Sequence, residues 1–173
     1  MEKILARAAK IKVVIFDVDG VLTDGSLYLT EQGEELKAFN SRDGHGMKML
    51  QSTGVEIAII TGRTSNIVSH RMNELGIKHV HQGQHDKTLA YEKLLKQLNV
   101  SADQVAYLGD DIVDLPVMSK VGLSVGVQDA HHFVKKHAHW LTPNVGGKGA
   151  ARDLCELIMQ AHGVLETELE KYL

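Results

Sequence analysis

The sequence predicts an α/β fold of the Rossmann-like type, a three-layer sandwich in which helices cover both faces of a parallel central sheet. Two observations predict this fold. Short apolar segments rich in β-branched residues recur along the chain, and stretches with helical spacing of apolar residues separate them. The segments expected to form strands are 12–16, 55–60, 77–81, 104–108 and 122–127.

Apolar residues at helical spacing predict the helices that connect these strands. Val68, Met72 and Leu75 lie at positions i, i+4 and i+7 before Gly76, which is suited to end a helix. A second apolar stripe runs through residues 91–98. In both segments charged residues stand between the apolar ones, so each helix is expected to bury one face against the sheet.

Residues 24–40 interrupt the alternation of strands and helices. Segments 26–30 and 35–39 are predicted to be two strands around a glycine-containing loop, which forms a hairpin flap beside the first strand. The last helical pattern carries its apolar face over 154–161. It leaves 164–173 as an acidic tail that still holds apolar residues and could dock on another surface.

Composition limits the class of protein. A chain of 173 residues with 43% hydrophobic and 24% charged residues suits a single globular domain over 1–173. Its formal charge of −3 provides no broad basic surface, so neither nucleic acid nor membrane is an expected partner. The single cysteine, Cys155, cannot form an internal disulfide, and no signal peptide is evident, so a cytoplasmic location is expected.

Polar residues follow three of the predicted strands directly. Asp17 and Asp19 follow the first strand, Thr61 follows the second, and Asp110 and Asp111 follow the fourth. Ligands of an open parallel sheet bind at the carboxyl ends of its strands, so these side chains are expected to converge. Gathering the four carboxylates without a cation would be costly, and oxygen ligands suit a hard divalent ion. The sequence therefore predicts a Mg²⁺ site.

The same residues suit the transfer of a phosphoryl group. An aspartate such as Asp17 can attack phosphorus and form an aspartyl-phosphate, which water then hydrolyses. Asp19 would protonate the leaving alkoxide and later deprotonate the attacking water. The hydroxyl of Thr61, nearby backbone amides and the ammonium of Lys87 would stabilise the negative charge of the phosphoryl group.

The order of these residues resembles the haloacid dehalogenase superfamily of aspartate-nucleophile phosphotransferases. The residues that match the motifs of the superfamily are Asp17 with Asp19, Thr61, Lys87, and Gly109-Asp110-Asp111 with Asp114. The resemblance implies that Asp17, Asp19, Thr61 and Lys87 are the catalytic residues. It also implies Mg²⁺ ligands from the Asp17 side chain, the Asp19 backbone carbonyl and the Asp110 side chain. Asp111 and Asp114 would hold these ligands in position without binding the metal themselves.

The spacing of the motifs leaves no room for an inserted cap domain. Only the hairpin and one helix separate Asp19 from Thr61, and one helix and one strand separate Thr61 from Lys87. Without a cap the site is open, so water exclusion and substrate selection must come from another part of the assembly. A neighbouring subunit or the C-terminal tail could supply them.

Within the capless group, segment 17–50 and the glycines of 146–149 resemble the phosphatases of 3-deoxy-D-manno-octulosonate 8-phosphate, over about 11–162 of the chain. This second resemblance implies a role in lipopolysaccharide precursor synthesis and a homotetramer whose tails reach a neighbouring active site. It also implies that Arg63 and Arg71 face the substrate carboxylate. The substrate-binding residues that it implies are Asp19, Asn40, Asp43, Gly44, Lys48, Gly62, Arg63, Arg71 and Lys87.

Two alternatives to this function stay open. The substrate could be another acidic sugar phosphate, such as sialic acid 9-phosphate, or the chain could be a non-catalytic regulatory or phosphoacceptor subunit. Asp19 argues against the second alternative, because a phosphoacceptor does not need an acid and base. The 10 histidines include no zinc-ligand pattern, and His45 is a candidate for substrate contact because glycines flank it.

Overall fold

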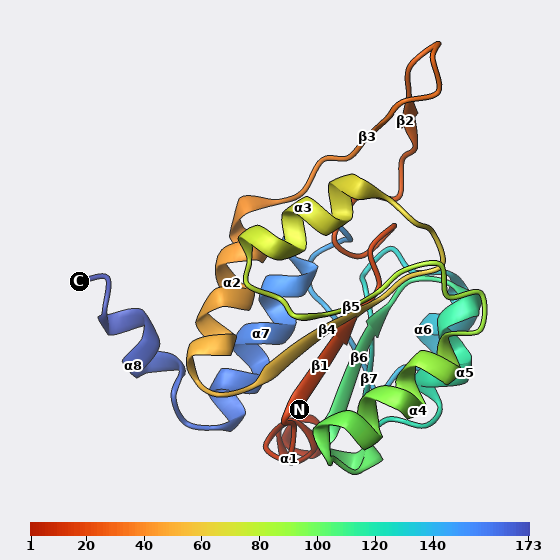
Figure 1. Ribbon diagram of the computed structural model, residues 1–173. Coiled ribbons are helices and arrows are strands. Elements are labelled where there is room, and N and C mark those ends of the chain that lie inside the picture. Colours follow the sequence, from red (N-terminus) through yellow and green to blue (C-terminus); the bar gives the residue numbers. More distant parts are fainter.

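The computed structural model describes residues 1–173 as a parallel sheet between two layers of helices, with a hairpin that projects from one end (Figure 1). The main sheet has six strands in the order β5-β4-β1-β6-β7-β8. Its strands are β1 (Val13–Phe16), β4 (Glu56–Ile60), β5 (His79–His81), β6 (Val105–Gly109), β7 (Leu123–Gly126) and β8 (Trp140–Leu141). The hairpin consists of β2 (Tyr28–Leu29) and β3 (Glu35–Leu36).

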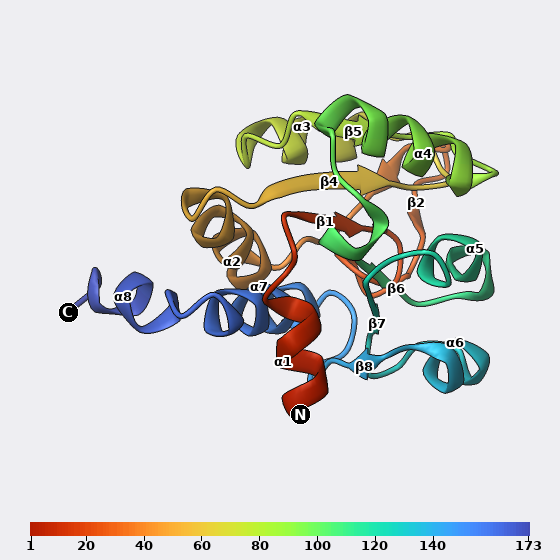
Figure 2. The ribbon, with the colours of Figure 1, turned by 90° about the horizontal axis from the view of Figure 1, so that it is seen from below.

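Eight α-helices accompany the strands. They are α1 (Glu2–Ala8), α2 (Ser41–Ser52), α3 (Asn66–Glu74), α4 (Lys87–Leu98), α5 (Leu115–Met118), α6 (His132–His137), α7 (Ala150–Ala161) and α8 (Leu165–Glu170), with short 3₁₀ turns at Ala102–Gln104 and Ile112–Asp114. Helices α2 to α6 lie between successive strands of the main sheet. From β1 the chain moves to β4 and β5 in one direction, and from β6 it moves to β7 and β8 in the other. Because such crossovers are right-handed, α2 and α3 cover one face and α4, α5 and α6 the opposite face. Figures 1 and 2 show this division, with α7 beside α2.

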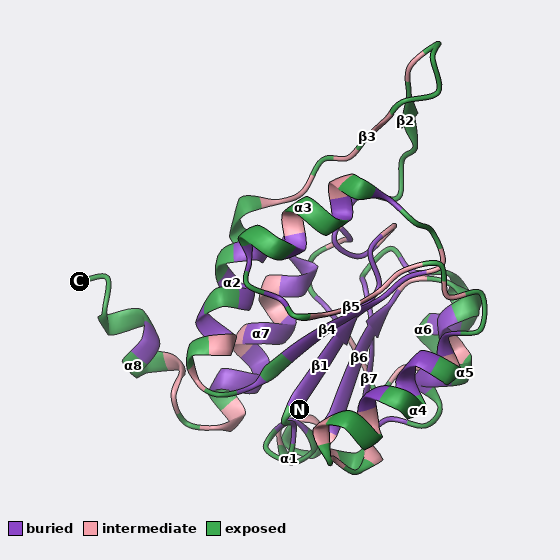
Figure 3. Ribbon diagram, in the orientation of Figure 1, coloured by how far each residue is buried: buried purple, intermediate pink, exposed green.

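The direction of winding reverses between β1 and β6, which are direct neighbours in the sheet. All four residues of β1 are buried between β4 and β6, and β4 beyond its exposed first residue, β6 and β7 are buried in the same way (Figure 3). Strands covered on both faces read as continuous apolar runs, as these do. The reversal opens a crevice at the carboxyl ends of β1 and β6, where ligands bind in such sheets.

The predicted fold class is confirmed, and the five predicted strands of the main sheet are present with no end shifted by more than two residues. The third strand starts at His79 instead of 77 because the Ile77 amide donates to Met72 O, which closes the end of α3. The strands of the hairpin are shorter than expected. Strand β8 was missed because its two residues are too few to show a period.

The C-terminal tail forms the short helix α8, which lies beside α2 (Figure 1). The Ser52 hydroxyl at the end of α2 donates to Glu168 Oε2 over 3.2 Å, and the rings of His45 and Tyr172 meet edge to face at 5.2 Å. The tail therefore does not cover the crevice of its own chain. None of the helices in the chain combines the length and the apolar character needed to cross a membrane.

Candidate active site

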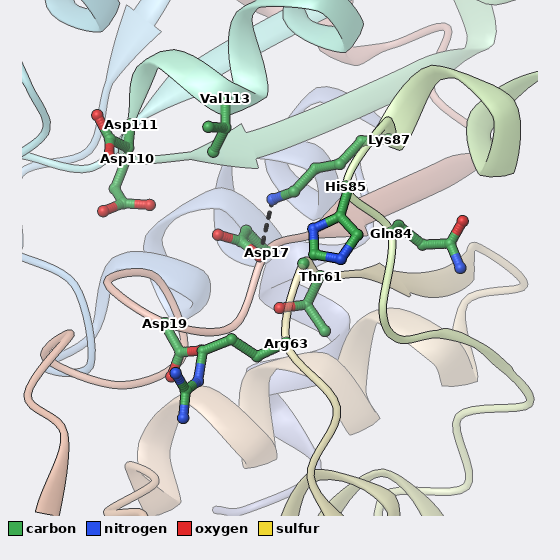
Figure 4. Close-up of a pocket in the computed structure, with 11 residues that line it drawn as sticks. Asp17, Asp19, Thr61, Arg63, Gln84, His85, Lys87, Asp110, Asp111 and Val113 are labelled. Carbon is green, nitrogen blue, oxygen red and sulfur yellow. Dashed lines mark ion pairs between the residues drawn. The ribbon is translucent and has the colours of Figure 1, made fainter.

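A pocket of about 260 Å³ lies at the carboxyl ends of the central strands (Figure 4). Its lining is almost wholly polar and consists of Asp17, Asp19, Thr61, Gly62, Arg63, Gln84, His85, Lys87, Asp110, Asp111 and Val113. The residues that follow β1, β4 and β6, together with the first residue of α4, therefore meet in one place. The convergence expected from the strand ends is present in the structure.

Lys87 is held at the floor of this pocket by the way α4 begins. Asp86 caps the helix by accepting from the Thr88 amide over 2.9 Å, and Lys87 then turns inward with only 4% of its surface exposed. Its Nζ lies 2.9 Å from Asp17 Oδ1 and 2.6 Å from Asp114 Oδ1. Burial alone would lower the pKa of Lys87, but the two carboxylates outweigh it and raise that pKa. Lys87 is therefore an ammonium ion at neutral pH.

Asp114 organises the floor of the pocket from a fully buried position. Its Oδ1 accepts from the Tyr107 hydroxyl over 2.6 Å as well as from Lys87. Its Oδ2 accepts from the backbone amides of Asp110 at 3.0 Å and Asp111 at 3.2 Å. Both oxygens are thus committed within the protein, and the supporting role expected of Asp114 stays a prediction. The bonds to the two amides fix the turn that carries Asp110 to the pocket.

The residues present fit a hard divalent cation. Carboxylate oxygens of Asp17, Asp110 and Asp114 lie within 4.8 Å of one another, and Lys87, 2.9 Å from Asp17 Oδ1 and 2.6 Å from Asp114 Oδ1, is a single positive charge beside these three acids. Asp114 has its own partners, so Asp17 and Asp110 remain to face a cation. Gly20 has a φ of +86°, and a Cβ there would collide with the Asp110 carboxylate. This glycine therefore makes room for the Asp110 side chain beside the β1 loop.

Burial raises the pKa of Asp110 to about 8, with added repulsion from Asp114 and Asp17, and burial also raises the pKa of Asp17 to about 6. Carboxyls with raised pKa values bind protons more tightly when folded, so the metal-free protein loses stability as pH rises from about 4 to about 8. A cation binds the ionised carboxylates and competes with those protons.

We therefore expect Mg²⁺ to raise the melting temperature more at pH 8 than at pH 6. Thermal unfolding with Mg²⁺ and with a chelator at both pH values measures the difference. In the variant Asp110→Asn the dependence on pH should become smaller, because one of the two titrating carboxyls is gone while Asp17 remains. Equal shifts at pH 6 and pH 8 in the unmodified protein would contradict the assignment of Asp110 to the cation site.

Asp19 lies at the rim of the pocket, in a network of charges that the sequence analysis did not find. Lys37, whose side chain is 2% exposed, forms an ion pair with Asp19 Oδ1 and lies 3.2 Å from Glu35 Oε1. Arg63 lies between the same two carboxylates, 3.7 Å from Asp19 Oδ2 and 2.8 Å from Glu35 Oε1. The base of the hairpin is therefore tied to the residue expected to act as acid and base.

Asn40 and Asp43 tie the start of α2 to the loop before α7. Asn40 Oδ1 caps α2 through the Arg42 amide at 2.8 Å, while its amide group donates to Gly147 O. Asp43 is buried and accepts from the amides of Gly149 at 3.2 Å and Arg152 at 2.9 Å. Burial raises the pKa of Asp43, although these two amides oppose the change. Contact of either residue with a sugar stays a prediction.

Gly44 and Arg71 line a second, small cavity, which shares no lining residue with the pocket that Arg63 lines. A Cβ on Gly44 would collide with the Arg71 guanidinium, so glycine allows this approach. Lys48 is exposed on α2 and lines neither cavity. Within one chain, the structure therefore does not join Arg63, Arg71 and Lys48 in a single substrate pocket.

The glycines of 146–149 support the turn that follows β1. The Gly147 amide donates to Val21 O over 2.8 Å, and a Cβ on Gly146 would collide with Gly20 O. The sequence indicated a turn before the last helix at this place. The structure shows in addition that the turn needs glycine because two backbone segments approach closely. His45, by contrast, contacts Tyr172 of the tail and does not line the pocket.

The fold and the pocket have the features of a haloacid dehalogenase-like hydrolase, with an aspartate pair after β1, a threonine after β4, a lysine at the start of α4 and an acidic cluster after β6. The family model of that description matches residues 79–154. This segment contains the lysine and the acidic cluster but not the aspartate pair.

Comparison with individual proteins extends the match to almost the whole chain. A 3-deoxy-D-manno-octulosonate 8-phosphate phosphatase of Yersinia pestis is 50% identical over 95% of this chain and 88% of the relative. The enzyme of the same name from Escherichia coli (strain K12) is 48% identical over 94% of this chain and 87% of its own length.

A solved structure of such a phosphatase from Moraxella catarrhalis, in complex with a magnesium ion, a phosphate ion and a KDO molecule, matches with a TM-score of 0.98. It is 38% identical to this chain, and the match covers 100% of this chain and 99% of that one. The present chain therefore belongs to the 3-deoxy-D-manno-octulosonate 8-phosphate phosphatase family of haloacid dehalogenase-like hydrolases, as the motifs predicted.

Proposed function

We propose that this protein hydrolyses 3-deoxy-D-manno-octulosonate 8-phosphate to the free sugar acid and inorganic phosphate, as a step of lipopolysaccharide precursor synthesis. One observation carries the proposal: the pocket unites Asp17, Asp19, Thr61 and Lys87 in a chain that is 50% identical to a phosphatase of this specificity. The single-domain organisation and the cytoplasmic location expected from the sequence are part of the same proposal.

In the first step of the proposed reaction, a carboxylate oxygen of Asp17 attacks the phosphorus atom. The bond between phosphorus and the sugar oxygen breaks, and Asp19 gives its proton to the departing alkoxide. In the second step, water attacks the phosphorus of the aspartyl-phosphate while Asp19 takes a proton from the water. The bond to Asp17 then breaks, phosphate leaves, and both aspartates return to their initial states.

The proposed mechanism uses donors around the phosphoryl group. The Lys87 ammonium and the Thr61 hydroxyl, with backbone amides such as that of Gly62, are expected to bind the phosphoryl oxygens. Mg²⁺, held by the Asp17 and Asp110 side chains and the Asp19 backbone carbonyl, would neutralise charge that develops on the phosphoryl group. Asp111 and Asp114 would hold this arrangement in place.

The substrate is tested by measuring phosphate release from 3-deoxy-D-manno-octulosonate 8-phosphate, sialic acid 9-phosphate and simple hexose phosphates, with and without Mg²⁺. Selective, metal-dependent turnover of the eight-carbon acid supports the proposal. Similar rates on all substrates would keep a phosphatase but remove this specificity. No release from any of them would favour a regulatory or phosphoacceptor subunit.

We also propose that the protein is a homotetramer in which each tail lies near a neighbouring active site. The apolar residues exposed on the hairpin, Leu27, Tyr28, Leu29 and Leu36, support contact between subunits. The tail lies along α2 and leaves the pocket of its own chain open. A lid over the pocket would therefore have to come from another subunit.

Deleting residues 164–173 should change the KM or the turnover number without unfolding the core. Val164 and Leu165 pack against the core, but the rest of the tail contacts its own chain at few points, so the deletion should lower stability only modestly. Steady-state kinetics on the intact assembly and thermal unfolding measure the two effects. Point changes of Leu169 and Tyr172, which are exposed, should change the kinetics in the same direction. Unaltered kinetics would contradict a role as a lid.

A further inference from the structure

His85 is a pocket residue to which neither the sequence motifs nor the proposed mechanism gives a role. It stands in the loop between β5 and α4, two positions before Lys87, and its side chain is exposed. Figure 4 shows its imidazole among the side chains that line the pocket, which include Thr61, Lys87 and Asp17. The ring therefore borders the same space as the residues expected to bind a phosphoryl group.

The charges of the pocket leave an anionic ligand short of free donors. Asp17, Asp19, Asp110 and Asp111 all line it, and each is an acid. Lys87, described above, is already shared between two carboxylates, and the guanidinium of Arg63 is shared between two others. A phosphomonoester that also carries a carboxylate brings further negative charge into this acidic pocket. Additional donors to that charge would be stabilising.

The imidazole of His85 is such a donor, and it is uncommitted. No hydrogen bond, ion pair or ring contact within the protein engages it, in contrast to the cations of the pocket. Whether neutral or protonated, an imidazole carries an N–H group that can donate to an anionic oxygen. His85 also stands on the loop whose end fixes Lys87, so the backbone holds the two donors at one side of the pocket.

We propose that His85 is a substrate-binding residue whose imidazole donates a hydrogen bond to a phosphoryl oxygen of the bound phosphomonoester. This inference rests on the proposed function and adds a phosphate ligand to it. The imidazole contributes to binding the ground state and takes no part in the bond changes at phosphorus. Its removal should therefore affect KM more than the turnover number.

The test compares His85→Ala with His85→Gln, which keeps an N–H donor on a flexible side chain, and with the control His70→Ala. His70 is exposed on α3 and lines neither of the two cavities described above. The KM for 3-deoxy-D-manno-octulosonate 8-phosphate and for p-nitrophenyl phosphate should rise about tenfold in His85→Ala, as should the inhibition constant of phosphate. His85→Gln should recover most of the loss, and His70→Ala should match the unmodified protein.

Other outcomes overturn the proposal. Unchanged constants in His85→Ala would show that the ring makes no contact with the ligand. A higher KM for the sugar acid phosphate with an unchanged inhibition constant of phosphate would place the contact on the sugar. If the unmodified protein hydrolyses no phosphomonoester, the proposed function fails. Calorimetric titration with inorganic phosphate and Mg²⁺ still tests His85, because it measures binding without turnover.

Discussion

Replacing Asp17 with asparagine is expected to lower the rate of phosphate release by at least about 10⁴-fold while the protein still folds. An amide is a far poorer nucleophile than a carboxylate, so the covalent step is lost. The fold should tolerate the change because burial and Asp114 disfavour the ionised form of Asp17 and raise its pKa to about 6, and because Lys87 keeps Asp114 as a partner. Phosphate release and thermal unfolding of Asp17→Asn measure the two expectations.

The variant Asp19→Asn distinguishes the role of Asp19 as acid and base from the role of Asp17 as nucleophile. It keeps the nucleophile and removes the acid and base, so its rate of phosphate release should fall less, by about 10²-fold to 10⁴-fold.

The attack of water is tested by isotope labelling of the unmodified protein. A single turnover in ¹⁸O-labelled water should place the label in released phosphate, and repeated turnovers should leave the Asp17 oxygens unlabelled if water attacks phosphorus. Activity of Asp17→Asn close to that of the unmodified protein would rule out an aspartyl-phosphate at this residue.

The central part of the site could be predicted because local sequence determines it. Asp17 directly follows a buried strand, and Thr61 and Asp110 follow two more strands of the same sheet. Parallel strands bring their carboxyl ends to one edge, so locating the strands in the sequence is enough to predict that these side chains converge. The glycines could be found in the sequence, but the segment that each one approaches could not.

The rest of the site depends on contacts between segments that sequence spacing does not relate. Lys37 has the appearance of an exposed lysine in a hairpin strand, yet its side chain is buried against Asp19 and Glu35. Asp43 has the appearance of a polar residue on a helix, yet it caps the start of α7 through the Arg152 amide. His85 fits no ligand pattern, and only the shape of the pocket brings it to notice.

Replacing Asp114 with asparagine is expected to destabilise the protein by about 3–5 kcal/mol, because the change removes one partner of a buried ion pair. Four donors converge on this carboxylate, two on each oxygen, from Lys87, Tyr107 and two backbone amides. An amide group in its place turns one oxygen into a donor that faces other donors. Urea unfolding of Asp114→Asn measures the loss. Phosphate release should fall as well, because Lys87 loses an anchor.

The exposed neighbour Asp111 provides a matched control. Its Oδ1 caps the following turn through the Ile112 amide, and asparagine caps as well as aspartate does, so Asp111→Asn should cost less than about 1 kcal/mol. A double-mutant cycle that combines Asp114→Asn with Lys87→Met measures how much of the loss of stability comes from the ion pair between these two residues. If Lys87 and Asp114 depend on each other, the double variant should be more stable than the sum of the two single losses predicts. Losses that simply add would show that Asp114 acts through Tyr107 and the two backbone amides and not through Lys87.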